Sequence, residues 1–571
     1  MENRRFILIA LLGVVLFFLY QAWQKDYAPA PHATAQATAE SLAAMQTDDD
    51  TLPQLSESDD DQPRIDAGDQ RGASSAPKAT AAGRVHVDTG LIHAEISLDG
   101  GELRRLELKN YPVSKKQPDT PLSLLDDRAG RLFILQTGVA GSQAPLVSHR
   151  SQFVAEQAQY QIEQGADHLD VVLTTQDETV SVRKVYRFYA NSYRVDVQHQ
   201  IHNNSSLALK ASAYSRLKRT EFKAGDEPPF VSTFTGVGFY QQKDEGGDKY
   251  RFVKTKLDKL GKEAFETRQD GGWIALLQHY FVAAIIPDAR QAGTFSARTL
   301  ANGPVPQYMA QYVGPAQSIE PGQTAAFDTE LYLGPKLQDH VSQVAPGFDL
   351  TLDYGILTPI SEPLFWLLTK LHNLLGNWGL AIIALTLLVK GAMFKLSEAQ
   401  YRSMAKMKKF GPRIQEIKDR HGDDREKMQK AMMDLYKKEG FNPLAGCWPM
   451  LVQFPVFIAL YWVLLESVEL RQAPFALWLQ DLTSPDPYFV LPVLFGISMF
   501  IQQRLSGHQA TDPLQQKIMN IMPIGLAVFF TMFQSGLVLY WFTSNLIGII
   551  QQWIITKKLE HDDAVKAAHR R

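Results

Sequence analysis

Hydrophobic and polar residues change their spacing several times along the chain. Two arginines, Arg4 and Arg5, precede an uncharged run at 6–23, which is long enough to cross a bilayer. We interpret residues 1–23 as a retained transmembrane anchor with its N-terminus in the cytoplasm. A cleaved secretory signal is the alternative, but the Ala-Pro-Ala triplet at 28–30 is a poor cleavage site because proline interrupts it.

Residues 24–83 have the composition of a disordered acidic linker. They are rich in Ala, Pro, Ser, Thr, Gln and Asp and carry 11 acidic against 4 basic residues. Such a segment buries too little apolar surface to offset the loss of chain entropy on folding.

From residue 84 the hydrophobic spacing has a period of two, which is typical of half-buried strands. The clearest runs are Ile92, Ala94, Ile96 and Leu98, and Tyr193, Val195, Val197, His199 and Ile201. Asn- and Gly-rich turns separate these runs. We therefore predict a large antiparallel β-sandwich over 84–345, outside the cytoplasm. No His/Asp/Glu cluster is apparent in this region, and His199 is more simply a packed strand residue than a metal ligand.

Residues 346–376 contain a stripe of leucines with helical spacing: Leu364, Leu367, Leu368, Leu371, Leu374 and Leu375. This pattern predicts an amphipathic helix that lies in the membrane interface. The alternative is an ordinary helix that docks onto the β-sandwich.

Five hydrophobic segments follow and predict a five-span core over 377–558, ahead of a tail at 559–571. They are Trp378–Phe394, Cys447–Leu465, Tyr488–Ile501, Ile518–Phe533 and Gly536–Ile555. Three of them have 17, 14 and 16 residues, fewer than the ~20 that a bilayer normally requires. We expect either a locally thinned membrane or polar helix ends at membrane depth.

Charge sets the predicted topology of these six spans. Residues 395–439 carry 13 Lys/Arg against 8 Asp/Glu, whereas the loop 466–487 has four acidic residues and only Arg471. Both termini and 395–446 are therefore predicted to be cytoplasmic, and the β-sandwich to be on the other side. The predicted fold class is a polytopic α-helical membrane protein with a large antiparallel β-sandwich outside the cytoplasm.

Composition excludes several kinds of chemistry. The single Cys447 permits neither an intramolecular disulfide nor a thiolate metal cluster, and no P-loop, dinucleotide-binding turn or zinc-hydrolase helix occurs. The net charge of −3 gives no argument for nucleic-acid binding. We expect no catalytic residue, no metal and no cofactor, and so not an enzyme.

Lys390 is the charged residue within the predicted spans. An intramembrane charge is costly unless it faces protein or water, which makes it a candidate for function. The alternative is that it snorkels to the cytoplasmic face, because Lys395 lies only about 7.5 Å further along a helix.

Uncharged polar residues also occur at membrane depth, and they include Thr386, Gln453, Ser544, Asn545, Gln551 and Gln552. Individually, each is more simply explained by helix packing. Together with Lys390 they predict a wet cavity that opens toward the cytoplasm. The basic segment 397–439 predicts a helical hairpin, and its methionines suit varied partners: Met404, Met407, Met428 and Met432.

Several sequence motifs resemble those of the bacterial YidC membrane protein insertase family, in the form with a large periplasmic domain. They are Ala399–Lys408 (AQYRSMAKMK), Asn442–Cys447 (NPLAGC), Val468–Trp478 (VELRQAPFALW), Asp512–Met519 (DPLQQKIM) and Ser535–Tyr540 (SGLVLY). They occur in order over roughly 356–556, the shared core of the family. The N-terminal resemblance rests on architecture more than on motifs.

The resemblance implies a hydrophilic groove with a positive residue at Lys390, where the family usually has arginine. Lysine keeps the charge but loses the planar fork that binds a carboxylate bidentately. Other groove positions fall on Thr386, Gln453, Tyr540, Trp541 and Ser544, and Trp541 replaces a more usual tyrosine. The hairpin 397–439 would be the mobile element that receives clients.

The function implied is that of an insertase and folding chaperone of the bacterial inner membrane, working alone or with the Sec translocon. Its partners would be nascent membrane proteins, the translocon and its accessory subunits, the ribosome with the signal recognition particle pathway, and membrane lipids. The alternatives are an ion-coupled transporter, which usually has intramembrane carboxylates and paired repeats, and a membrane-anchored scaffold with a periplasmic binding domain.

Overall fold

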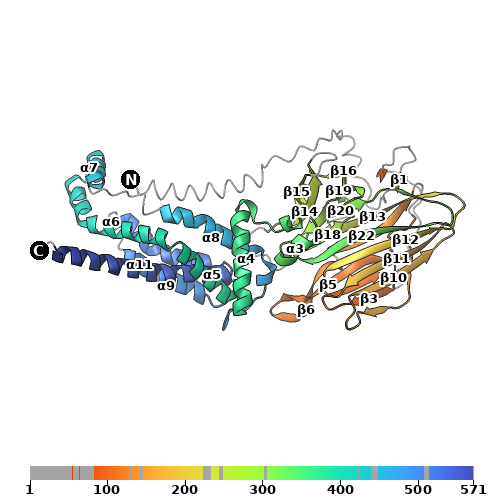
Figure 1. Cartoon of the computed structure of the whole chain (residues 1–571), viewed down its shortest axis with the longest axis horizontal. Helices are drawn as coiled ribbons and strands as arrows, with labels where there is room; N and C mark the ends of the chain where they lie inside the picture. Colours follow the sequence, from red (N-terminus) through yellow and green to blue (C-terminus); the bar gives the residue numbers. More distant parts are fainter. Residues whose placement is uncertain are drawn as a thin grey trace.

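The computed structural model describes residues 54–55, 63–64 and 83–569, except for 129, 142–145, 223–232, 244–248, 301–304, 422–423, 439–447 and 507–512. Two parts lie end to end in Figure 1: a β-rich part and a bundle of helices. We call residues 84–336 the β-domain. The predicted anchor 1–23 lies outside the described residues.

The β-domain contains two large sheets. The first has the order β15-β14-β17-β18-β22-β12-β11-β10-β8. Its strands are β8 (Val154–Ala155), β10 (His168–Gln176), β11 (Val180–Tyr189), β12 (Arg194–Asn203), β14 (Gly236–Gln242), β15 (Tyr250–Lys256), β17 (Trp273–Leu277), β18 (Phe281–Ile286) and β22 (Thr324–Pro335).

The second sheet has the order β16-β19-β20-β13-β7-β6-β5-β4-β3-β9, and β21 pairs with β13. Its strands are β3 (Arg84–Asp88), β4 (Ile92–Ser97), β5 (Glu102–Ser114), β6 (Gln117–Arg128), β7 (Arg131–Gly141), β9 (Gln159–Gln161), β13 (Leu209–Thr220), β16 (Phe265–Asp270), β19 (Ala292–Leu300), β20 (Gln307–Val313) and β21 (Gln317–Ile319). The strand pairs in both sheets are antiparallel apart from β3–β9, which is parallel.

The alternation of the sequence explains why the two sheets pack together. In β12 every second residue is buried, as the predicted run from Val195 to Ile201 requires. Side chains from the two sheets meet in one core; the Phe239 ring of β14 lies 5.0 Å from that of Phe265 in β16. His199 is 1% exposed, with Nε2 3.5 Å from the Thr137 hydroxyl, so it is a packed strand residue.

Within the predicted linker the described residues form a short antiparallel pair, β1 (Gln54–Leu55) with β2 (Pro63–Arg64). The β-domain is followed by α3 (Gln338–Val344) and two 3₁₀ turns, η2 (Phe348–Thr351) and η3 (Gly355–Leu357). A third turn, η1 (Leu257–Lys259), follows β15.

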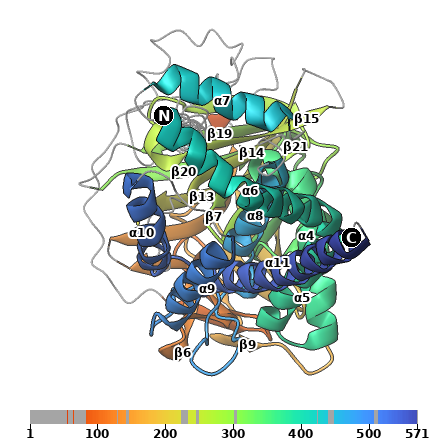
Figure 2. The same ribbon diagram turned by 90° about the vertical axis from the view of Figure 1, so that its left-hand side faces the viewer.

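Where the structure describes it, the C-terminal part consists mainly of helices, and its longest described connection is the loop at 467–489. Its helices are α4 (Thr358–Leu375), α5 (Trp378–Ala392), α6 (Phe394–His421), α7 (Arg425–Lys438), α8 (Trp448–Glu466), α9 (Val490–Ser506), α10 (Pro513–Phe530) and α11 (Ser535–His569). Figure 2 views the bundle from the end opposite the β-domain, with α9 between α10 and α11. The five predicted hydrophobic segments fall on α5, α8, α9, α10 and α11.

Among the described residues, α11 is long and apolar enough to cross a membrane by itself, over Ser535–Leu559. The pair α5 and α6 passes the same test together but is bent by 65°. The apolar stretches Val452–Glu466, Val490–Leu505 and Met519–Phe530 are shorter, as the segment lengths predict.

Helix α4 runs across the bundle, between the other helices and the β-domain (Figure 1). Its leucine stripe is divided. Leu368 is buried, and Leu364, Leu367 and Leu371 pack on the helical core, whereas Leu374 is 80% exposed. The Ser361 hydroxyl donates to the Ala459 carbonyl of α8 at 3.3 Å. This helix therefore docks onto the helical bundle rather than onto the β-sandwich.

The loop after α8 joins the two parts. Arg471 donates to the carbonyls of Pro112 and Val113 at 2.9 and 3.2 Å, and the 3₁₀ turn η5 (Val468–Leu470) places Val468 in the core of the β-domain. These contacts link the tip of the β5–β6 hairpin to the helical part.

A buried ionic cluster lies at the same junction. The Lys336 ammonium at the end of β22 is 3.8 Å from the Glu466 carboxylate at the end of α8, and both side chains are less than 8% exposed. His279 Nε2 lies 3.8 Å from the other oxygen of Glu466. Burial and the charge of Lys336 lower the pKa of His279 to about 3, so this imidazole is neutral at physiological pH. The ion pair is therefore formed by Lys336 and Glu466.

Glu469, in η5, should make the stability of the protein depend on pH. One of its oxygens accepts the Gln338 backbone N–H at 2.9 Å, and the other is buried without a hydrogen-bond partner. Burial raises the pKa of this carboxyl to about 7. The pKa of Glu469 is higher in the folded protein than in the unfolded chain. The free energy of unfolding is therefore at its highest below about pH 4.5 and falls as the pH rises through 7.

We expect Glu469→Gln to be more stable than the wild type at pH 8, by on the order of 2 kcal/mol, and equal to it near pH 4.5. Thermal unfolding of both proteins at the two pH values measures this. Exposed Glu163 supplies the matched control, Glu163→Gln. An equal difference at both pH values would show that the carboxyl does not titrate in this range.

Candidate functional site

Lys390 lies in the last turn of α5, where three helices meet. It is half-buried, and its ammonium donates to Gln453 Oε1 of α8 at 3.4 Å. Its own carbonyl accepts from Gln551 Nε2 of α11 at 3.4 Å. The outward-facing neighbours Leu387 and Leu388 are about half exposed. The ammonium is therefore neither sealed among helices nor fully exposed.

Gln453 also reaches the predicted aromatic pair. A side-chain hydrogen bond joins it to Tyr540 of α11, and the Tyr540 side chain is buried. The Phe457 ring, one helical turn from Gln453, lies parallel to that of Tyr540 at 6.3 Å. The structure thus brings together Lys390, Gln453 and Tyr540 from α5, α8 and α11.

Thr386 is one helical turn before Lys390 on α5. Its side chain is buried and its hydroxyl donates to the Ile382 carbonyl of the same helix at 2.6 Å. This bond satisfies the hydroxyl locally, which is the usual arrangement of a threonine inside a helix. The described contacts of Thr386 are those of helix packing.

Trp541 points into an aromatic cluster rather than toward Lys390. Its ring lies 4.6 Å from Phe457, 5.6 Å from Phe495 and 4.7 Å from Phe530. Its indole N–H is buried without a hydrogen-bond partner. Trp541 therefore fills space between α8, α9, α10 and α11.

Ser544 is half-buried, one turn after Tyr540 on α11.

The predicted polar residues Asn545, Gln551 and Gln552 extend the site along α11, and Ser498 on α9 contacts Asn545. Gln551 and Gln552 are buried, and the Asn545 amide donates to the Ser498 hydroxyl at 3.2 Å. Tyr401, near the start of α6, forms a hydrogen bond with Gln502. Gln551 comes eleven residues after Tyr540, a spacing that places both on one helical face.

The predicted cytoplasmic hairpin is present as α6 and α7. Met428 and Met432 are half-buried on α7, one helical turn apart. The side chains of Met404 and Met407, on α6, lie outside the described residues.

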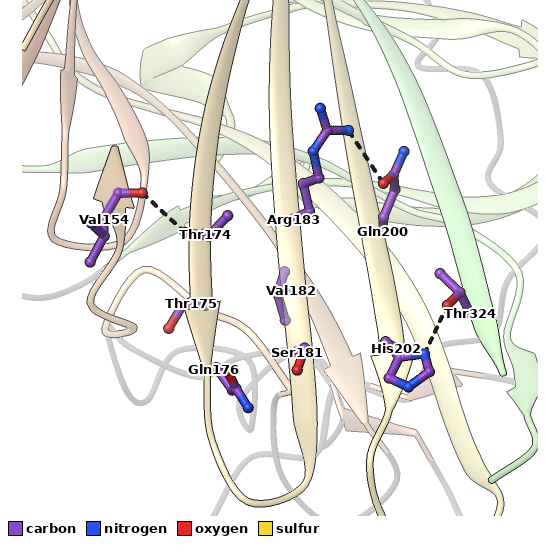
Figure 3. Close-up of a pocket in the computed structure, with 10 residues that line it drawn as sticks. All are labelled: Val154, Thr174, Thr175, Gln176, Ser181, Val182, Arg183, Gln200, His202 and Thr324. Carbon is purple, nitrogen blue, oxygen red and sulfur yellow. Dashed lines mark hydrogen bonds between the residues drawn. The ribbon is translucent and has the colours of Figure 1, made fainter. Parts of the chain in front are cut away.

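A hollow of about 530 Å³ lies on the β-domain, over β8, β10, β11, β12 and β22. Figure 3 shows the residues that line it. Its hydrogen bonds join Thr174 to Val154, Arg183 to Gln200 and His202 to Thr324, and no predicted site residue lines it. This hollow is open, and Arg183 is the charged residue among its lining residues. The convergence of three helices on one lysine is the stronger indication of a site.

Comparisons with known proteins also divide the chain into an N-terminal and a C-terminal part. Residues 84–367 match the family described as YidC periplasmic domain, and 370–562 match that described as 60Kd inner membrane protein. A solved structure of a YidC insertase with its first transmembrane domain is similar, with a TM-score of 0.38 and 16% identity over 83% of this chain and 92% of the other.

Curated relatives match over almost the full length. The membrane protein insertase YidC of Nitrosococcus oceani is 43% identical over 98% of this chain and 100% of its own. That of Methylococcus capsulatus is 43% identical over 99% and 100%. The identity extends across both parts, so the chain belongs to the YidC family of membrane protein insertases.

Proposed function

We propose that this chain is an insertase of the bacterial inner membrane that moves hydrophobic segments of nascent proteins from the cytoplasm into the bilayer. The contact of Lys390 with Gln453, next to Tyr540, carries the proposal. A cation and two polar groups at the meeting of α5, α8 and α11 make a place where polar flanks of a client are solvated at membrane depth.

The proposed topology has six spans, with both termini in the cytoplasm and the β-domain in the periplasm. The basic segment 395–439 and the acidic loop 466–487 support it, because positive loops stay inside. The bend of 65° between α5 and α6 falls at Met393, shortly after Lys390. In the proposed topology, Lys390 therefore lies near the cytoplasmic end of its span.

Insertion requires no bond chemistry in this mechanism. An emerging client meets the hairpin 397–439, its polar flank enters a hydrated groove around Lys390, and acidic flanks are attracted by the ammonium. The apolar segment then slides along α8 and α11 into lipid, driven by ~25 cal/mol per Å² of apolar surface removed from water. Short spans that thin the bilayer would shorten the polar crossing.

The direct partners in this mechanism are nascent membrane proteins and lipids. Delivery by the ribosome and the signal recognition particle pathway, and cooperation with the Sec translocon and its accessory subunits, complete the proposal. The basic surface of α6 and α7, with half-buried Met428 and Met432, is the element we assign to client reception.

Reconstitution into lipid vesicles tests the function. We expect purified protein to insert a short client with one hydrophobic segment in the absence of nucleotide, measured as protection of the translocated end from protease. Protein-free vesicles are the control. Transport of small ions without client insertion would contradict the proposal and favour a transporter.

A further inference from the structure

Two adjacent strands of the β-domain place imidazoles and carboxylates on one face. Ligand atoms of His86, His93 and Glu95 all lie within 4.8 Å of one another. The two imidazole rings are nearly parallel, with centroids 6.2 Å apart. His93 Nδ1 is also 3.4 Å from the Asp88 carboxylate. All four side chains are half-buried.

Strand register creates this group from residues that no sequence motif connects. In the β3–β4 pair, His86 is directly opposite Glu95, and Asp88 is opposite His93. Directly opposite side chains on one face have Cβ atoms about 4.5–5.5 Å apart. Each cross-strand pair therefore combines one imidazole with one carboxylate, and the two pairs are neighbours.

The protein core fixes the face to which these side chains point. The intervening residues Val85, Val87, Ala94 and Ile96 are at most 1% exposed. If the strand register shifted by one residue, these four side chains would face solvent, so the register is strongly specified. Thr89 closes the hairpin, accepting from the Leu91 and Ile92 backbone N–H groups at 3.2 and 3.0 Å. The donors thus stand on a rigid support, which favours a defined binding geometry.

Neighbouring cations orient the two carboxylates through one oxygen of each, and Asp88 Oδ2 faces His93 Nδ1 at 3.4 Å. Arg84 donates to Glu95 Oε2 at 2.6 Å, and Lys109 donates to Asp88 Oδ1 at 2.7 Å. Arg105 lies 3.6 Å from Glu95 Oε1, beyond hydrogen-bond distance. Hydrogen bonds of this kind to a ligating carboxylate are typical of the outer shell of metal sites.

The surrounding charges are balanced, so a dication would not meet a net positive field. Arg84 also pairs with Asp127 at 2.6 Å, and Arg105 pairs with Glu107 at 3.0 Å. Together with Lys109 these residues give three cations against the four carboxylates of Asp88, Glu95, Glu107 and Asp127.

We propose that His86, His93 and Glu95, with Asp88 beside them, form a binding site for a divalent transition metal such as Zn²⁺. Two imidazoles and a carboxylate suit zinc and its neighbours, whereas Mg²⁺ and Ca²⁺ prefer oxygen ligands alone. Zinc–nitrogen distances of about 2.0–2.1 Å require the ligand atoms to approach one another, which half-exposed side chains permit by small rotations. No metal is expected from the sequence, because these residues show no motif spacing.

Metal titration of the purified full-length protein tests the site. After treatment with EDTA, Zn²⁺ is titrated against a chromophoric chelator, and Co²⁺ binding is followed by visible absorption. We expect the wild type to bind one more equivalent than His93→Ala, or to bind it at least tenfold more tightly, and Glu95→Gln to lose affinity similarly. Mg²⁺ should not compete.

Exposed His168, on β10, provides the matched control, and His168→Ala should bind like the wild type. Circular dichroism and thermal unfolding without metal check that each variant is folded. Equal Zn²⁺ stoichiometry and affinity for the wild type and His93→Ala would overturn the proposal. So would Co²⁺ spectra that are unchanged by both His93→Ala and Glu95→Gln.

Discussion

Lys390→Ala should reduce insertion of clients with acidic translocated flanks by about tenfold and leave neutral clients nearly unaffected. The ammonium meets Gln453 at the junction of α5, α8 and α11, so its charge acts on a flank that occupies this place. An attraction of one or two kcal/mol corresponds to a factor of about 5–30. Lys390→Arg keeps the charge and should retain insertion of both client types. Protease protection in reconstituted vesicles measures each.

Lys395 supplies the control for this experiment, because its side chain is 93% exposed and only five residues away. Lys395→Ala removes the same charge from the surface and should change the insertion of neither acidic nor neutral clients. If Lys390→Ala inserted acidic and neutral clients equally well, Lys390 would be a snorkelling charge without a role in client recognition.

Lys336→Met should destabilise the protein by about 3–5 kcal/mol, because it leaves the Glu466 carboxylate buried without its counter-charge. The double variant Lys336→Met with Glu466→Leu should recover most of this loss, since a buried ion pair and an apolar pair of similar size are often close in stability. Thermal unfolding in detergent, followed by tryptophan fluorescence, compares the wild type, both single variants and the double variant at one pH.

Lys254 and Asp353 form a more exposed pair at the same junction, with side chains 39% and 37% accessible. Lys254→Met should therefore cost no more than about 1 kcal/mol. If the double variant at 336 and 466 were as unstable as the sum of its two single variants, the two charges would not be coupled.

Most of the fold follows from local periodicity. Strict alternation in 193–201 predicts β12 with the correct buried face, because a strand between two layers has a period of two. The apolar segments predict α5, α8, α9, α10 and α11. The six-span count remains a prediction, since within the part of the chain that the structure describes, composition and length identify only α11 and the bent pair α5–α6 as long enough.

The site is less predictable because it depends on which helices meet. Lys390 and Gln453 are separated by 63 residues, and hydropathy marks both as unusual without showing that they touch. Thr386 shares the face of Lys390 but bonds to its own helix, and Trp541 turns into an aromatic cluster. Spacing on a helix gives the face of a residue, whereas its neighbour depends on packing.

The acidic residues of the loop 466–487 show a second limit of prediction from the sequence. As charges they indicate topology, but in the structure they also organise the chain. Asp481 accepts from the Gln472 and Thr483 backbone N–H groups at 3.1 and 2.9 Å, and Asp486 accepts from Leu491 at the start of α9 at 2.7 Å. A count of charges does not reveal such roles, because they depend on the turns that the side chains cap.

Helix α8 contacts both the β-domain and the helical bundle. Glu466 at one end is fixed to the β-domain by Lys336, and Gln453, thirteen residues or roughly 20 Å away, touches Lys390. Pro455 lies between them and lacks the backbone N–H that would bond to the preceding turn. Because one helix makes both contacts, we expect a tilt of the β-domain against the bundle to change the distance between the Gln453 amide and the Lys390 ammonium.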